Sequence, residues 1–315
     1  GDTVVLTAAS AGTTLTGTYT IDAGDASSDL TVSSFAIGTV ADTAGNAMTS
    51  TTVPSNNIAD SSAIVVDTSA PTISSFSSST SDGSYNVGDT INITATASES
   101  IQSGNTLTVT LDTGDTVLLT AASAGTTLTG TYTVGAGDTS SDLTVSSFSI
   151  GTVEDTAGNA MTSTTVPSSN NIADNSAIVV DTSAPTLSSS SPADDATAVA
   201  VGSNIVLNFS EAVDVESGDI VIYKTSDNSV IETIAVGSGQ VTGTGTTQIT
   251  INPSSDLASS TEYYVQIAAT GFDDATGNSY AGITDTTSLS FTTADIVAPT
   301  LSSSSPADDA TAVAV

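Results

Sequence analysis

The chain repeats itself with a period of about 114 residues, and this period constrains its fold more than any other feature. The segment GDTVVLTAASAGTTLTGTYT at 1–20 returns with one change at 114–133. Three prolines, Pro71, Pro185 and Pro299, lie 114 residues apart. A unit of this length is too long for one turn of a solenoid and has the size of an independent domain. The sequence therefore predicts domains in series.

The repeats divide the chain into four segments. Residues 1–67 are predicted to be the last part of one domain, 68–181 and 182–295 to be two complete domains, and 296–315 to be the start of the next. The first two copies are nearly identical and the third has diverged, so features that all three share are the more informative ones. Because the sequence starts and stops within a repeat, we expect it to be part of a longer protein.

Each repeat has the pattern of short β-strands. Apolar and polar residues alternate in TINITATA (90–97), TLTVTLD (106–112), DIVIYK (219–224) and EYYVQI (262–267). Thr, Val, Ile and Tyr dominate these runs, and Gly, Asp, Asn and Ser separate them, as in strands that are bounded by turns. About seven such strands per repeat predict an all-β chain of tandem Ig-like Greek-key β-sandwich domains in a linear array.

The composition excludes several classes of function. The chain has 34 acidic residues against one basic residue, a formal net charge of −33, and no His, Cys or Trp. A single basic residue cannot neutralise a phosphate backbone, so we expect no nucleic-acid partner. A Ser-His-Asp triad, a Cys nucleophile and a His-ligated zinc site are likewise impossible, and we expect no enzyme. No run of 18 apolar residues is present, which argues against membrane insertion of this segment.

One acidic loop motif recurs in every repeat. It reads DTAGN at 42–46 and 155–159, and DDATGN at 273–278. Gly and Asn tolerate a positive φ and Asp accepts backbone N–H groups, so the motif could be a turn. By itself the motif is more often a turn than a ligand, but carboxylate and amide oxygens are also the ligands that calcium prefers, so the motif could instead belong to a metal site.

The expected topology favours the metal site. In a seven-stranded sandwich, the loop after the second strand (98–105 or 210–218), the DTAGN-type loop and the aspartate of the linker all lie at the end where the chain enters. Carboxylates that meet there would repel one another unless a cation binds. The predicted ligands of calcium are Asp67, Glu99, Asp155 and Asn159 at one joint; Asp181, Glu211, Asp273 or Asp274, and Asn278 at the next; Asp42 and Asn46 at the joint before; and Asp295 at the joint after.

Longer stretches resemble a known family. APTLSSSSPADDATAVAVGSNIVLNFSEAVD, with LASSTEYYVQI, DDATGN and LSFTT, resembles the bacterial Ig-like domains that are repeated in giant surface adhesins. VVDTSAPTISSF, with VGDTINITATASE and DTAGN, is similar to repeats in the extender regions of calcium-dependent RTX-type adhesins. The resemblance covers 182–295 well and the other repeats moderately. It implies extracellular sandwiches in series, with calcium stiffening the links, that hold a binding tip away from the cell.

These observations lead to one main hypothesis and two alternatives. The main hypothesis is a stalk segment of a secreted or outer-membrane-anchored bacterial adhesin, whose partners are calcium ions and the neighbouring repeats of the same chain. In the first alternative, identical chains pair laterally through edge strands into a filament, sheath or S-layer. The second is a carbohydrate-binding module at Tyr263–Tyr264, although one of these rings should lie in the core.

Overall fold

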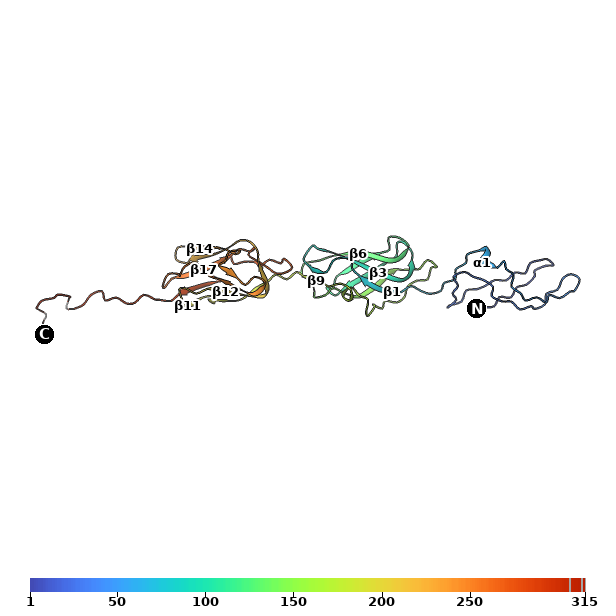
Figure 1. Ribbon diagram of the computed structural model, residues 1–315, viewed down its shortest axis with the longest axis horizontal. Coiled ribbons are helices and arrows are strands. Elements are labelled where there is room, and N and C mark those ends of the chain that lie inside the picture. Colours follow the sequence, from blue (N-terminus) through green and yellow to red (C-terminus); the bar gives the residue numbers. More distant parts are fainter. Residues whose placement is uncertain (306, 313, 315) are drawn as a thin grey trace. The chain divides into compact units, whose positions relative to one another are not determined.

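The computed structural model describes residues 1–305, 307–312 and 314, and its regular secondary structure is almost entirely β-strand, as the alternating pattern predicts (Figure 1). Pro306, Val313 and Val315, which belong to the predicted start of the next repeat, lie outside the described residues. The chain divides into two compact units, of which the first comprises Gly1–Gly83, Asp89–Val134 and Ser140–Val179 and the second Ser84–Gly88, Gly135–Thr139 and Val180–Val315.

The first unit contains an antiparallel sheet of six strands in the order β1-β3-β6-β5-β4-β8. Side chains alternate between buried and exposed along these strands, so one face of the sheet forms the core. Phe76 of β1 contacts Phe148 of β8, with 5.5 Å between the ring centroids, so the two edges of the sheet approach each other. The strands are β1 (Ile73–Ser77), β3 (Thr90–Ile101), β4 (Thr106–Leu111), β5 (Thr116–Thr120), β6 (Gly125–Thr133) and β8 (Val145–Thr152).

A smaller sheet has the order β2-β9-β7. Its strands are β2 (Gly83–Tyr85), β7 (Thr139–Ser140) and β9 (Ile178–Asp181). Ile178 and Val180 of β9 are buried, in agreement with the alternation of this strand. A 3-10 helix, η1 (Ile172–Asp174), precedes β9 and is capped by the side chain of Asn171.

Residues 1–67 have the local structure of a repeat but no named strand. They contain helix α1 (Ile58–Ser61), which Asn57 caps as Asn171 caps η1. Three isolated antiparallel bridges join Thr7 to Thr16, Ser27 to Val66, and Ala41 to Ala47.

The second unit holds a sandwich of two sheets. One has the order β10-β12-β16-β15, with β18 paired to β12, and the other has the order β11-β19-β17-β13-β14. β11 runs parallel to β19, so the strand of the second sheet that comes first in the sequence lies beside the one that comes last. The strands are β10 (Leu187–Ser191), β11 (Ala196–Val199), β12 (Ile205–Val215), β13 (Asp219–Lys224), β14 (Ser229–Ala235), β15 (Val241–Thr242), β16 (Thr246–Ile251), β17 (Glu262–Ile267), β18 (Phe272–Asp273) and β19 (Ser290–Thr293).

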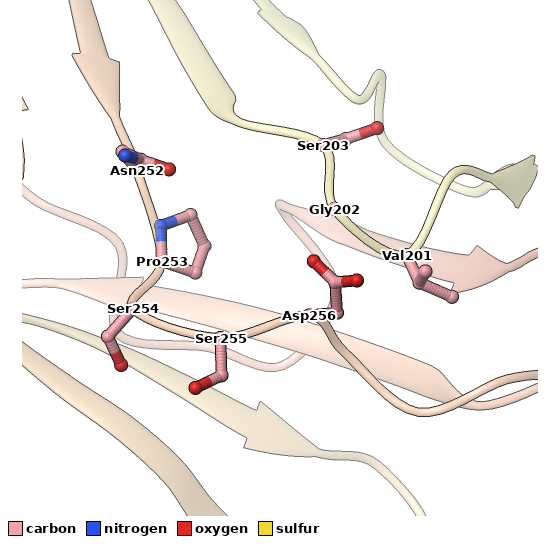
Figure 2. Close-up of a pocket in the computed structure, with 8 residues that line it drawn as sticks. All are labelled: Val201, Gly202, Ser203, Asn252, Pro253, Ser254, Ser255 and Asp256. Atoms are coloured by element: carbon pink, nitrogen blue, oxygen red, sulfur yellow. The ribbon is translucent and has the colours of Figure 1, made fainter.

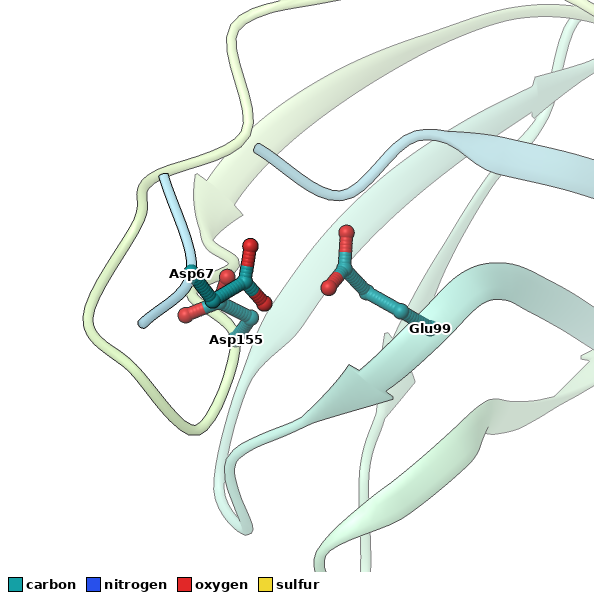
Figure 3. Close-up of side chains that lie close together, drawn as sticks. All are labelled: Asp67, Glu99 and Asp155. Atoms are coloured by element: carbon teal, nitrogen blue, oxygen red, sulfur yellow. The ribbon is translucent and has the colours of Figure 1, made fainter. Parts of the chain in front are cut away.

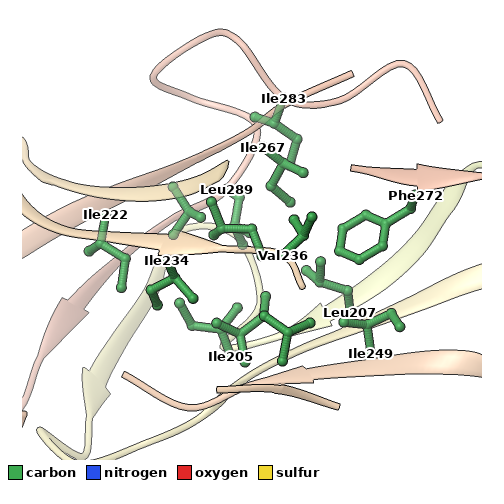
Figure 4. Close-up of a cluster of buried hydrophobic side chains, with 14 of the residues drawn as sticks. Ile205, Leu207, Ile222, Ile234, Val236, Ile249, Ile267, Phe272, Ile283 and Leu289 are labelled. Atoms are coloured by element: carbon green, nitrogen blue, oxygen red, sulfur yellow. The ribbon is translucent and has the colours of Figure 1, made fainter. Parts of the chain in front are cut away.

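Aliphatic side chains from both sheets fill the core of this sandwich (Figure 4). Ile205 and Leu207 of β12 meet Ile222 of β13 within one buried cluster. At one end of the cluster, Phe209 contacts Phe272 and Tyr280, with centroid distances of 5.4 and 5.2 Å. Burial of such apolar surface is the main favourable contribution to folding in this chain, which has no cysteine for disulfides and a single Lys or Arg residue for ion pairs.

Two strands extend further than the sequence pattern predicts. The segments 98–105 and 210–218 were expected to be loops, but β3 continues to Ile101 and β12 to Val215. Pairing resumes after a shift in register, with Ile101 opposite Gly125 and Val213 opposite Thr246. Glu99 and Glu211 therefore lie on strands, which hold them more rigidly than a loop would. Among the described residues, no helix is long and apolar enough to cross a membrane.

Candidate metal centres

The DTAGN loop at 155–159 is a tight turn built around the carboxylate of Asp155. Its Oδ1 accepts hydrogen bonds from the backbone N–H groups of Ala157 (2.8 Å) and Asn159 (2.9 Å), and its Oδ2 accepts one from the Asn159 side chain (2.8 Å). Gly158 has a φ of 94°, which favours glycine at this position of the turn. The turn interpretation of the motif therefore describes its backbone.

The other two copies of the motif have the same geometry. Asp274 accepts from the backbone N–H groups of Thr276 (2.8 Å) and Asn278 (2.9 Å) and from the Asn278 side chain (2.8 Å). Asp42 accepts the equivalent bonds, with both those from Asn46 at 2.8 Å. Since the diverged repeat keeps every one of these bonds, the motif specifies the turn directly.

The turns at 155–159 and 274–278 are also hydrogen-bonded to the segment through which the chain enters the β-sheets. The side-chain amide of Asn159 donates to the backbone carbonyl of Asp67 at 3.1 Å, and that of Asn278 donates to the carbonyl of Asp181 at 3.1 Å. Both asparagines were predicted as metal ligands. In the structure their amide nitrogens hold the carboxylate and the linker carbonyl together, which is a positioning role.

Three carboxylates meet at the turn of residues 155–159 and form a group that we name the first cluster. Asp67 lies just before β1, Glu99 lies on β3, and Asp155 follows β8. One carboxylate oxygen from each of the three lies within 4.8 Å of the others, and Figure 3 shows the side chains directed toward one another. Asp155 is buried, and the other two are partly exposed. Residues far apart in the sequence are thus brought together as the predicted topology requires.

The same arrangement recurs in the second unit as the second cluster. It consists of Asp181, the last residue of β9, Glu211 on β12, and Asp274 after β18, again with oxygens within 4.8 Å of one another. Of the two aspartates predicted as alternatives, the structure brings Asp274 into the cluster. Asp273 lies on β18 outside it, with an Oδ1 that is buried and has no hydrogen-bond partner.

The charges of each cluster act on one another. Burial, and then the charges of Asp67 and Asp155, raise the pKa of Glu99. Burial also opposes the charged form of Asp155, but the hydrogen bonds from the turn outweigh it and lower the pKa of that carboxyl. Each cluster therefore combines a fixed aspartate anion with a glutamate whose charge is unfavourable.

The second cluster has the same electrostatic pattern. Burial, followed by the charges of Asp274 and Asp181, raises the pKa of Glu211, whereas the hydrogen bonds of the turn lower the pKa of Asp274 in spite of its burial. The chain has a single Lys or Arg residue, Lys224, and it lies on β13. Neither group of carboxylates contains a basic partner.

The remaining predicted ligands are not assembled into such groups. Asp42 has the hydrogen bonds of its own turn, and Asp295 accepts from the Val297 backbone (3.0 Å) and the Ser259 hydroxyl (3.4 Å). Within the described part of the chain, neither belongs to a group of three acidic side chains at this distance. Asp42 thus corresponds to the turn aspartate of a cluster and Asp295 to the linker aspartate. Among the described residues, neither is joined by two further carboxylates.

Two further features bear on other kinds of site. A small polar pocket of about 90 Å³ lies between the loops before β12 and after β16 (Figure 2), and its residues are Val201, Gly202, Ser203, Asn252, Pro253, Ser254, Ser255 and Asp256.

Tyr263 and Tyr264, which were weighed as a carbohydrate platform, are both buried. Tyr264 stacks on Tyr223 with 4.8 Å between the ring centroids. Neither of the two buried rings offers an exposed face.

Comparison with known proteins places part of the chain in a family. Residues 181–293 match the family model described as "Bacterial Ig-like domain". No curated protein matches the chain. Among solved structures, a chimeric titin Z1Z2-Z1Z2 tandem functionalised with an exogenous GRGDS peptide from fibronectin is 11% identical, with a TM-score of 0.21, and the match covers 72% of this chain and 100% of that one. That score is too low for the likeness to support a conclusion. The family match and the observed sandwich agree: residues 181–293 match the model of bacterial Ig-like domains and fold as two packed β-sheets.

Proposed function

We propose that this chain is a structural stalk segment of a bacterial surface adhesin, and that each carboxylate cluster binds a calcium ion. One observation carries the proposal: the same three carboxylates meet at the same place in two repeats whose sequences have diverged. Three acidic side chains without a basic partner destabilise a fold unless a cation binds among them. Their retention in both repeats is therefore best explained by a ligand.

The geometry of the clusters suits calcium. Calcium binds six to eight oxygens at about 2.3–2.6 Å, so two of its ligand oxygens can lie up to about 5 Å apart. The oxygens of each cluster lie within 4.8 Å of one another. Magnesium needs a near-ideal octahedron at about 2.0–2.1 Å, which three side chains from separate elements would not readily form. Backbone carbonyls and water would complete the shell.

A bound ion would stiffen the entry to each sandwich. In the first cluster it would fix Asp67, which precedes β1, to β3 and to the turn after β8. In the second cluster it would fix Asp181, at the end of β9, to β12 and to the turn after β18. The short segments between repeats would lose their freedom, and neighbouring repeats would act as one semi-rigid spacer.

The rest of the chain is consistent with an extracellular location. Residues 181–293 match the bacterial Ig-like domain model, which agrees with the resemblance of this repeat to the domains of giant surface adhesins. The net charge of −33 produces strong self-repulsion, which the cations of a salty exterior would screen. Calcium ions and the adjoining repeats of the same chain are the partners that this proposal requires.

Small-angle X-ray scattering on residues 68–295 tests this function. We expect a defined maximum dimension in millimolar calcium and a broad distribution of distances in excess chelator at the same ionic strength. Glu211→Gln should give the broad distribution under both conditions. Glu216→Gln, which removes an exposed charge outside the cluster, should behave as the unchanged protein. Identical profiles with and without calcium would refute the proposal, and a multiple of the monomer mass would favour lateral assembly.

A further inference from the structure

The repeat at 182–295 holds its opening and closing strands side by side. β11 pairs in parallel with β19, with Val199 opposite Thr293. The backbone N–H of Ala294 continues this pairing and donates to the Val199 carbonyl at 2.7 Å. The chain enters the repeat through β10 and β11 and leaves it directly after β19. The segment through which the chain enters is therefore bonded to the segment through which it leaves.

Two aspartates fasten this pair of strands at its start. Asp194, just before β11, accepts a hydrogen bond from the backbone N–H of Ser290, the first residue of β19, at 2.9 Å. The Ser290 hydroxyl lies 3.1 Å from a carboxylate oxygen of Asp194 and 3.1 Å from one of Asp195. Ser290 is only 6% exposed, so water competes little for these bonds. The bond from Ser290 to Asp194 joins residues 96 positions apart in the sequence.

The repeat at 68–181 has the same fastening. Asp82, just before β2, accepts from the backbone N–H of Ala177, just before β9, at 2.9 Å and across 95 positions. The next residue, Gly83, donates to the Ala177 carbonyl at 3.0 Å. The sequences around the two aspartates, SDGS at 81–84 and ADDA at 193–196, have only this aspartate in common. The long-range carboxylate bond thus persists in two repeats whose neighbouring residues differ.

We propose that Asp194 and Asp82 are force-bearing residues that keep their repeats folded when the chain is pulled by its ends, a role that rests on the proposed stalk function. Tension pulls β11 back toward its start and β19 onward toward its end. Because the two strands are parallel, these pulls oppose each other along the strand axis. The bonds between the strands are then loaded together, whereas a strand that is peeled from one end loses its bonds one at a time.

The aspartates matter because the ladder between these strands is short. β11 has four residues, and its register against β19 shifts between Ala196 and Val199. β10, which precedes it, is bonded to β12 of the other sheet, so its detachment transfers the load to β11. Hydrogen bonds from a backbone N–H to a carboxylate are stronger than bonds between neutral groups. The side-chain bonds at the start of β19 therefore supply a large part of the resistance to shear.

This resistance is independent of the carboxylate clusters. Asp82, Asp194 and Asp195 belong to neither group of three carboxylates in the described part of the chain. Removal of calcium should therefore leave the force-bearing bonds unchanged. For the same reason, failure of these bonds under force would leave the calcium-dependent scattering profile of the stalk proposal unaffected, and the two proposals can fail separately.

Force-clamp spectroscopy of the full chain, held by its two ends in excess chelator, tests the proposal. Loss of charged hydrogen bonds in Asp194→Ala should raise the unfolding rate of one of the two complete repeats about tenfold at constant force. Asp82→Ala should do the same for the other repeat, and the double variant should accelerate both. Unfolding rates that equal those of the unchanged chain would overturn the proposal.

Asp227→Ala is the matched control. Asp227 also accepts from a backbone N–H (3.1 Å) and a hydroxyl (2.7 Å), both of Ser229, but this bond lies within the turn between β13 and β14 and does not join the two ends of the repeat. The control should leave the unfolding rate under force unchanged, and an acceleration equal to that of Asp194→Ala would contradict the proposal. If Asp194→Ala does not fold, Asp194→Asn retains one acceptor oxygen without the charge. It should accelerate unfolding under force to a smaller extent, and an unchanged rate would again overturn the proposal.

Discussion

Replacing Glu99 with Gln should stabilise the sandwich of residues 68–181 when calcium is absent. Oxygens of Glu99, Asp67 and Asp155 lie within 4.8 Å of one another. Two unit charges at that separation repel by about 0.9 kcal/mol in water and by about 3.5 kcal/mol at an effective dielectric constant of about 20. Because Glu99 is partly exposed, screening should leave about 1–3 kcal/mol of total repulsion for Gln to remove.

Scanning calorimetry in chelator should show this gain as a rise of about 4–12 °C in the melting temperature of that sandwich. Saturating calcium should reverse the order, because the variant has lost a ligand while the unchanged protein gains the free energy of binding. Glu154→Gln is the matched control, since it removes an exposed charge next to Asp155 without altering the cluster. It should change neither melting temperature by more than about 2 °C.

The pH dependence of the gain from Glu99→Gln shows whether that gain comes from charge repulsion. Burial and neighbouring charges raise the pKa of Glu99 above its ordinary value of 4.5, so its charge disfavours the metal-free fold at neutral pH. As the pH falls through the raised pKa toward 4.5, protonation removes that penalty, and the advantage of Glu99→Gln should disappear. A destabilised variant in chelator, or an equal gain from Glu154→Gln, would refute the reasoning.

Three further predictions concern the fold and the turns. Leu119→Ala should lower the free energy of unfolding by about 2–5 kcal/mol in chemical denaturation, because Leu119 is fully buried. Leu118→Ala is the control and should change it little, because Leu118 is exposed. Hydrogen bonds, chiefly from the Ser288 hydroxyl, lower the pKa of Asp285 to about 2, so its contribution to stability is present above pH 3.8 and lost as the pH falls toward 2; melting temperatures over this range should fall more for the unchanged chain than for Asp285→Asn. Asn278→Ala removes the bond to the Asp181 carbonyl, and hydrogen exchange should show faster opening of the 274–278 turn with little effect on the core strands.

Local sequence patterns predicted the longer strands of the sheets and missed short ones such as β7, β15 and β18. The segments DIVIYK and EYYVQI coincide with β13 and β17. Alternation places Ile220 and Ile222 of β13 in the core, whereas Tyr263, Tyr264 and Val265 of β17 are buried in succession. The ends of β3 and β12 were harder to predict. Both strands continue beyond a shift in register, and pairing after such a shift depends on a partner strand that the local sequence does not reveal.

The candidate site was predictable in its topology and less so in its details. The repeat, the acidic linker residue and the turn motif together indicated that Asp67, Glu99 and Asp155 would meet. The spacing of the motif distinguishes Asp274 from Asp273, because Asp precedes Asn by four residues in every copy, and the structure shows that Asp274 starts the turn whereas Asp273 ends β18. The sequence could not show that the asparagine amide would bind the linker carbonyl, since that contact joins residues 97 positions apart.

The most direct test of the central claim is a calcium titration of the full chain by isothermal calorimetry. The account predicts saturable binding that falls in part with Glu99→Gln or Glu211→Gln and is lost when both are changed. The paired control, Glu154→Gln with Glu216→Gln, removes the same number of charges outside the clusters and should leave binding unchanged. Binding that both double variants retain equally would contradict the claim, because calcium would then be responding to the overall charge of the chain.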